Sequence, residues 1–232
     1  MDIHGLQKLT LLDYPGRVAC TVFLGGCNLR CPFCHNSELL DAHTVEPLMD
    51  DAELLKFLES RRGILEGVCI TGGEPTLRPE LSDILRKIKD MGYPVKLDTN
   101  GFFHEHLAYL LSENLVDYVA MDIKNSRDRY AETCGLMCMD LSPVYDSIEL
   151  LIKGTVDYEF RTTVVDELHD YNSFYDIANL ISGAKHYFLQ PFTDRDTVAY
   201  AGLHAPSAER LAEYADIVRP YVETVAIRGA EG

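Results

Sequence analysis

The strongest constraint on the fold is an alternation of short apolar runs with amphipathic helical patterns along the chain. Six runs have the length and β-branched composition of buried strands, at residues 18–24, 67–71, 95–99, 116–123, 158–165 and 186–190. Helical patterns follow them at residues 50–62, 79–91, 104–115, 142–153, 173–182 and 206–219. Six such units predict right-handed crossovers and a parallel sheet, either an open doubly wound sheet or a complete or partial barrel.

The organisation of the chain predicts a single domain over residues 1–232. The sequence contains no internal repeat and no Gly/Ser-rich linker, and 47% of its residues are hydrophobic, which is enough to build one sizeable core. A last apolar run at about residues 222–228 predicts a short terminal strand.

The charge balance limits the classes of partner. The chain has 21 Lys and Arg against 37 Asp and Glu, a formal net charge of -16. This field repels phosphate backbones and anionic lipid surfaces, so we expect neither a nucleic-acid nor a membrane partner. The first residues lack a basic stretch followed by an apolar run, and no stretch approaches the roughly 20 apolar residues that span a bilayer, so a cytoplasmic location is predicted.

Polar or small residues stand at the C-terminal end of each expected strand. In strand order they are Gly25, Gly26 and Cys27; Gly72, Gly73 and Glu74; Asp98 and Thr99; Asp122 and Lys124; Arg161; and Gln190. In parallel α/β architectures these ends meet at one rim, where active sites lie. Loop starts alone would explain the polarity, but not a charge inside an apolar run such as that of Asp122.

Three of the seven cysteines lie within eight positions. Cys27, Cys31 and Cys34 form a CxxxCxxC pattern in a loop over residues 25–36. A structural zinc site wants four ligands, and His35 is the nominal fourth, although adjacent residues rarely point to one tetrahedral centre. An iron-sulfur cubane with three cysteines keeps one iron open for chemistry. The spacing favours the iron-sulfur cluster and leaves zinc as the alternative.

The cysteine loop and five later motifs resemble those of one family. Residues 11–36 read LLDYPGRVACTVFLGGCNLRCPFCHN, followed by TGGEP at 71–75, LDTNG at 97–101, MDIK at 121–124, EFRTTVV at 159–165 and LQPF at 189–192. Together they resemble radical S-adenosylmethionine (SAM) enzymes, particularly the activating enzymes of glycyl-radical enzymes. The compact activase of anaerobic ribonucleoside-triphosphate reductase is the most similar, because the pyruvate formate-lyase activase has DGPG where this chain has DYPG.

The resemblance implies the fold and the cofactors. It implies a laterally open, partial (β/α)6 TIM-like barrel of the radical SAM type. It also implies that Cys27, Cys31 and Cys34 hold a 4Fe-4S cluster whose open iron binds SAM, and that these cysteines are the catalytic centre. A low-potential donor such as flavodoxin or ferredoxin would supply the electron, and a glycyl-radical enzyme would be the protein substrate.

Further residues match SAM-binding positions of the family. Gly72 and Gly73 let backbone oxygens approach the ammonium group of SAM, while Glu74 fixes the turn. Phe33 stands where relatives have an aromatic residue near the adenine. Arg161 and Gln190, on the fifth and sixth strands, are expected on the SAM side of the sheet.

Two acidic positions raise a question of charge. Asp98, Thr99 and Asp122 resemble positions that hold a monovalent cation against the carboxylate of SAM in the pyruvate formate-lyase activase. Two carboxylates facing an anionic ligand repel it, so a bound cation or Lys124 has to offset their charge. The structural alternative is that Asp98 caps a helix and that Asp122 pairs with Lys124.

Some features keep more than one interpretation. Residues 13–17 resemble the segment that receives the partner's glycine loop, but DYPG is also an ordinary turn. Cys20 and Cys69 are expected in the core, whereas Cys134 and Cys138 are interpreted as surface thiols or a redox pair. A radical SAM enzyme acting on a small molecule and a zinc-stabilised binding module are the competing functions.

Overall fold

The protein is described by a computed structural model over residues 1–229, which divides into two compact units. Unit 1 consists of Met1–Asn28, Glu38–Thr99 and Phe103–Val119. Unit 2 consists of Leu29–Ser37, Asn100–Phe102 and the rest of the chain from Ala120. One boundary, between Asn28 and Leu29, falls inside the cysteine loop, and another follows Ser37, so unit 1 contains Cys27 and unit 2 contains Cys31 and Cys34.

The sheet of unit 1 is built on β3 (Ala19–Leu24), β5 (Gly67–Gly72) and β6 (Val95–Thr99), which are parallel to one another. All three are largely buried, as expected for parallel strands covered on both faces. The antiparallel strand β2 (Gly5–Thr10) pairs with β3, and β1 (Asp2–Ile3) forms a separate short pair with β4 (Met49–Asp50). Strand β2 is not among the predicted strands, because its exposed middle residues give no apolar run.

The helices of unit 1 are α1 (Asp51–Ser60), α2 (Leu81–Asp90) and α3 (His104–Ser112), with a 3₁₀ turn η2 (Pro75–Leu77) after β5 and a further turn η1 (Ser37–Leu39) at the unit boundary. Asp50 caps α1 in a capping box with Glu53, so the predicted start at residue 50 is confirmed. The predicted start of α2 at Pro79 is wrong. Arg78 closes the η2 turn by donating to Pro75 O at 3.0 Å, and α2 begins only after Glu80.

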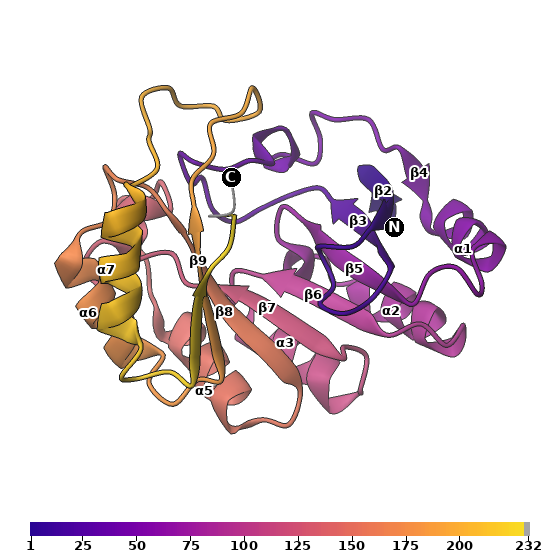
Figure 1. The fold of residues 1–232 in the computed structure, drawn as a ribbon. Helices are drawn as coiled ribbons and strands as arrows, with labels where there is room; N and C mark the ends of the chain where they lie inside the picture. The colour runs from indigo at the N-terminus through magenta and orange to yellow at the C-terminus, as the bar shows by residue number, and fades with distance from the viewer. Residues whose placement is uncertain (230–232) are drawn as a thin grey trace. The chain divides into compact units, whose positions relative to one another are not determined.

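Unit 2 contains the parallel strands β8 (Asp157–Val164), β9 (His186–Pro191) and β10 (Thr224–Ile227). Its helices are α4 (Tyr130–Thr133), α5 (Ser142–Lys153), α6 (Tyr171–Leu180) and α7 (Ala208–Val218). Helices α6 and α7 lie side by side next to β9 (Figure 1). Helix α6 starts two residues earlier than predicted because Asp170 caps it.

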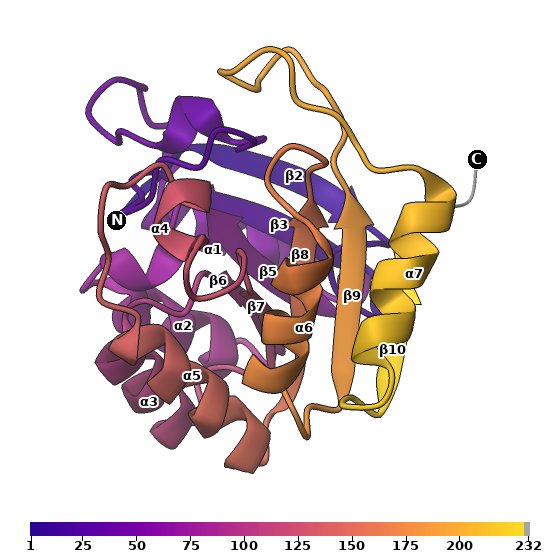
Figure 2. The same cartoon turned by 90° about the vertical axis from the view of Figure 1, so that its left-hand side faces the viewer.

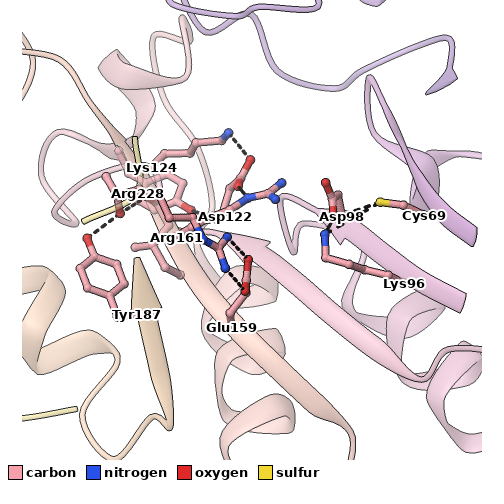
Figure 3. A network of polar contacts seen from close by, with 12 residues as sticks. Cys69, Lys96, Asp98, Asp122, Lys124, Glu159, Arg161, Tyr187 and Arg228 are labelled. Carbon is pink, nitrogen blue, oxygen red and sulfur yellow. Dashed lines mark hydrogen bonds and ion pairs between the residues drawn. The ribbon is translucent and has the colours of Figure 1, made fainter. Parts of the chain in front are cut away.

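The predicted terminal strand is confirmed as β10. Arg228, directly after β10, donates to both carboxylate oxygens of the buried Glu159 in β8 at 2.6 Å. Its guanidinium also lies 3.6 Å from the ring centroid of Phe188 in β9. This bidentate pair, visible in Figure 3, fixes the end of the described chain to the sheet of unit 2.

The strand order is β10-β9-β8-β7-β6-β5-β3-β2, and the unit division falls within β7 (Tyr118–Asp122). The outer strands β2 and β10 each have one neighbour, so the sheet is not closed. Each of the six predicted strands is present and is followed by a helix, and Figure 2 shows the long loop that leads from β9 to α7. None of the helices over residues 1–229 has both the length and the apolar character that a bilayer crossing requires.

Candidate active site

The glycine turn after β5 lies directly against the start of the cysteine loop in unit 1. Gly26 O accepts a hydrogen bond from Glu74 N at 2.8 Å, and Gly26 N donates to Leu39 O at 2.8 Å. A Cβ atom at Gly73 would stand 2.1 Å from Gly26 O and 3.3 Å from the Cβ of Cys27. Only a residue without a side chain fits this approach, so the turn is built to hold the backbone next to Cys27.

Glu74 is a structural carboxylate of this turn. It is 1% exposed, and its Oε1 accepts hydrogen bonds from Thr76 N at 3.0 Å and Thr99 Oγ1 at 2.8 Å. Through these bonds it caps η2 and joins the end of β5 to the end of β6. The prediction that Glu74 fixes the turn agrees with these contacts, and Thr99 lies beside it as the rim prediction requires.

Asp98 carries a built-in counter-charge. Its carboxylate is ion-paired with Lys96, which is 2% exposed, and the Sγ of Cys69 lies 3.8 Å from Asp98 Oδ1 (Figure 3). The sequence did not single out Lys96, because a lysine in an alternating strand pattern suggests an exposed position. The helix-capping alternative for Asp98 is wrong, since the residue lies within β6.

In unit 2, Asp122 lies between two cations. Its carboxylate accepts from Arg161 Nε at 2.5 Å and from Lys124 Nζ at 2.8 Å (Figure 3). Burial alone would raise the pKa of Asp122, but the charges of Arg161 and Lys124 outweigh it and hold the pKa well below its ordinary value. The pKa of Lys124 is raised, because the attraction of Asp122 outweighs the effect of burial. The structure therefore brings these three predicted residues together.

Two of the loop cysteines differ in electrostatic environment. A side-chain hydrogen bond from Cys134, helped by the charge of Lys124, outweighs burial and lowers the pKa of Cys31 to about 7. Burial raises the pKa of Cys34 instead. A thiolate is the form that binds metal, so Cys31 is prepared for ligation in the folded chain.

Other loop residues pack within unit 2. Phe33 is buried, and Lys124 Nζ lies 5.9 Å from the centroid of its ring. His35 Nε2 is hydrogen-bonded to Thr193 O at 2.7 Å, and the His35 ring stacks on Phe192. Because this nitrogen is engaged with a backbone carbonyl, the arrangement does not favour His35 as a zinc ligand.

The donor set of the cysteine loop fits an iron-sulfur cluster better than zinc. Three thiols match a cubane with one open iron, whereas a structural zinc site is closed by four ligands. Across residues 1–229, no three His, Cys, Asp or Glu side chains stand together as a group that could hold a metal ion. The convergence of Cys27, Cys31 and Cys34 on one centre stays a prediction.

Residues 21–183 match the family model of the Radical SAM superfamily, which is more than half of the chain. The chain belongs to the radical SAM superfamily. It is 33% identical over 99% of its length to a candidate glycyl-radical enzyme activating enzyme of Methanocaldococcus jannaschii, of which the match covers 97%. It is also 35% identical to the pyruvate formate-lyase-activating enzyme of Clostridium pasteurianum, over 54% of this chain and 53% of that enzyme.

Two solved structures share the fold of this one. SuiB of Streptococcus suis bound to precursor peptide SuiA matches with a TM-score of 0.69 and 13% identity, over 91% of this chain and 48% of SuiB. Native anSMEcpe with bound AdoMet matches with a TM-score of 0.56 and 21% identity, over 88% of this chain and 62% of that protein. The predicted partial α/β barrel is confirmed, and the chain is a radical SAM enzyme.

The positions of Cys134 and Cys138 correct one expectation for this radical SAM enzyme. Cys134 is fully buried, whereas Cys138 is exposed, so the two are not a pair of surface thiols. Cys20 and Cys69 are buried in the core as predicted. Gln190 lies in β9 in register with Thr163 of β8, and its role toward SAM stays a prediction.

Replacing Asp122 by asparagine is expected to lower the free energy of unfolding by about 2 kcal/mol. Breaking a fully buried ion pair costs roughly 3–5 kcal/mol, and we expect less here because Asp122 is 28% exposed. The variant leaves Lys124 and Arg161 without their counter-charge. The lowered pKa means that Asp122 stays ionised above its ordinary value of 3.8. Urea unfolding should therefore give the same difference from the parent protein at pH 5.5 and pH 8.

The matched control is Asp166→Asn, which removes the more exposed pair between Asp166 and Arg210. This change should cost less than about 1 kcal/mol, as is usual for surface pairs. The stability difference between Asp122→Asn and the parent could instead be smaller at pH 5.5 than at pH 8. That result would show that burial, and not the two cations, determines the pKa of Asp122.

Proposed function

We propose that the protein is an activase that generates a glycyl radical on a partner enzyme, with Cys27, Cys31 and Cys34 holding a 4Fe-4S cluster. The observation that supports this most is the similarity over 99% of the chain to a candidate activating enzyme of nearly the same length. The open sheet also suits admission of a protein loop rather than full enclosure of a small substrate. Residues 13–17 are the proposed receiving segment, although Tyr14 itself is buried.

When bound, the cluster and SAM would supply the one-electron chemistry that removes a hydrogen atom from glycine, with the electron coming from the low-potential donor. The chain supplies ligation, orientation and shielding. Cys31 presents a thiol with a lowered pKa, and the Gly72-Gly73 turn brings backbone close to Cys27. Phe33, beside Lys124, is the proposed adenine contact.

The remaining SAM contacts are proposed at the strand ends. In unit 1 these are Gly72, Gly73, Glu74, Asp98 and Thr99, and in unit 2 they are Phe33, Asp122, Lys124, Arg161 and Gln190. A monovalent cation near Asp98 and Asp122 remains part of the proposal. Lys96, Lys124 and Arg161 already offset these two carboxylates, so we expect the cation to contribute less than the lysines and the arginine do.

The partner is proposed to be anaerobic ribonucleoside-triphosphate reductase. The DYPG segment supports this choice. So does LQPF at residues 189–192, where the pyruvate formate-lyase activase tends to have a histidine-containing motif. The alternative is activation of pyruvate formate-lyase, which the 35% identity to the Clostridium pasteurianum activase over half of the chain favours. A radical SAM reaction on a small molecule is the further alternative.

The deciding experiment mixes reduced, cluster-loaded protein with SAM and one candidate partner under anaerobic conditions. We expect a glycyl doublet in the electron paramagnetic resonance spectrum with the anaerobic reductase and none, or a much weaker one, with pyruvate formate-lyase. A reductase variant whose radical glycine is replaced by alanine is the control. A doublet only with pyruvate formate-lyase would reverse the choice of partner, and none with either would exclude both partners.

Three further assignments complete the proposal. The electron donor is a low-potential protein such as flavodoxin or ferredoxin, and no nucleic acid or membrane takes part. The cytoplasm is the proposed location, supported by seven cysteines that are all free. Residues 1–232 are proposed to act as one radical SAM domain, since the two units interleave along the sequence and the family match spans both.

A further inference from the structure

A histidine side chain is bonded to the backbone at the entry to the cysteine loop. His4 lies between β1 and β2, and its Nδ1 accepts a hydrogen bond from Gly25 N at 3.0 Å. The imidazole ring also packs so closely on Gly25 that a Cβ atom there would lie 2.7 Å from the ring carbon Cε1. A side chain at position 25 would displace the ring, so this contact requires a glycine. Both residues belong to unit 1.

The amide of Gly25 differs from the two that follow it. Gly26 N donates to Leu39 O at 2.8 Å, and Cys27 N donates to Leu40 O at 3.2 Å, so backbone carbonyls satisfy both. Gly25 is buried, and within residues 1–229 the acceptor of its N–H group is a side chain. A buried amide that loses its acceptor is costly, so this point of the loop depends on the residue type at position 4.

The course of the N-terminal strands explains why a side chain is needed there. Strand β1 pairs with β4 and does not extend the pairing of β2 with β3. The carbonyl of Ile3 accepts from Leu48 N at 2.7 Å, so it is already engaged with another segment. The backbone of His4 is fixed as well, since His4 N donates to Phe23 O at 2.9 Å. The ring is therefore held in place from the end of β3.

The bond also determines the form of the ring. Because Nδ1 accepts from an N–H group, it carries no proton, and the proton of the neutral ring lies on Nε2. Nε2 is buried and has no hydrogen-bond partner within the described residues. An apolar side chain of similar size would avoid this unsatisfied donor. What a histidine gains at position 4 is the bond from Nδ1 to Gly25.

We propose that His4 is a positioning residue for the cluster ligand Cys27, because its Nδ1 holds the Gly25 amide and so fixes the backbone from which Cys27 presents its thiol. This inference rests on the proposed function, in which Cys27 ligates the cluster. The next residue, Gly26, is held through its carbonyl by Glu74 N at 2.8 Å. The entry to the loop is thus fixed at two adjacent residues, once by a side chain and once by the glycine turn. Groups that orient metal ligands affect metal affinity by about 10–100-fold.

The test compares His4→Leu, which removes the acceptor, with His4→Asn, whose Oδ1 accepts in the place of Nδ1. In the full-length apoprotein, hydrogen exchange of a peptide that contains residues 24–27 is followed by mass spectrometry and reports on the bond itself. In anaerobically reconstituted protein, the rate of iron release to a chelator reports on ligation. We expect both rates to rise at least about 10-fold in His4→Leu and to stay near those of the parent in His4→Asn.

The matched control is Ile3→Val, which removes a buried methylene from the preceding residue and keeps the bond to Gly25. This variant lowers stability without removing the acceptor, so its iron release should equal that of the parent. Should His4→Leu fail to fold, His4→Ala removes the same acceptor without a branched side chain.

The outcomes separate this inference from the function on which it rests. Parental iron release by His4→Leu would overturn the positioning role, whether or not its amides exchange faster, and would leave the proposed function intact. Iron release by Ile3→Val as fast as that of His4→Leu would also overturn it, because stability alone would then explain the effect. A parent protein that takes up no iron on reconstitution would contradict the proposed function, and this assay precedes every comparison of variants.

Discussion

Replacing Cys31 by serine is expected to abolish both the brown absorbance after anaerobic reconstitution and the reductive cleavage of SAM. Cys31 is 9% exposed and has a pKa lowered to about 7, so the folded chain supplies a thiolate at low cost near neutral pH. Serine offers a harder oxygen that stays protonated there. We expect cleavage to fall by more than about 100-fold, since even outer-shell changes at metal sites cost about 10–100-fold.

The control for Cys31→Ser is Cys138→Ser, which removes an exposed thiol. Iron and acid-labile sulfide are measured together with methionine and 5'-deoxyadenosine after reduction with a chemical donor. Cys138→Ser should contain as much iron and sulfide as the parent and produce as much methionine and 5'-deoxyadenosine. Cleavage of SAM by Cys31→Ser at the parental rate would contradict the assignment of Cys31 as a ligand, and zinc without sulfide in the parent would contradict the iron-sulfur cluster.

The sequence predicts the strands well where burial on both faces leaves a continuous apolar run. Strands β3, β5 and β6 are of this kind, and their observed bounds differ from the predicted ones by no more than a residue at each end. Strand β2 lies at the outer edge of the sheet with exposed residues in its middle, and periodicity alone does not detect such a strand. Helix starts depend on local bonds that periodicity does not show. The start of α6 is set by its cap Asp170, and that of α2 follows the η2 turn, so both predicted starts are displaced by two residues.

Some residues of the candidate site can also be recognised from the sequence, and others cannot. Asp122 and Arg161 could be singled out because a charge inside an apolar run demands a partner, and the structure supplies that partner for each. Lys96 is buried yet gives no such signal, since lysine alternates with apolar residues in β6. Cys134 was missed as a neighbour of Cys31 because contacts across so long a separation are set by tertiary packing, which residue spacing does not encode.

Replacing Gly73 by alanine is expected to lower the free energy of unfolding by about 3 kcal/mol, near the upper end of what overpacking costs. The added Cβ would meet Gly26 O at 2.1 Å and Gly26 C at 2.6 Å, and neither backbone atom can rotate away. This collision is avoided only if the Gly72-Gly73 turn moves away from the cysteine loop. That movement breaks the hydrogen bond from Glu74 N to Gly26 O. We therefore expect SAM affinity, measured by equilibrium dialysis on cluster-loaded protein, to fall at least 10-fold.

The matched control for Gly73→Ala is Gly92→Ala at the end of α2. Gly92 has φ of +87° and no heavy atom within 4 Å of its added Cβ, so this variant carries backbone strain of about 1 kcal/mol without a collision. Its SAM affinity should equal that of the parent. Equal stability of Gly73→Ala and Gly92→Ala in urea, with normal SAM binding by both, would contradict the close contact between Gly73 and Gly26. A loss of affinity in Gly73→Ala without a loss of stability would instead mean that the turn yields locally, and that its close approach to Cys27 serves SAM binding rather than folding.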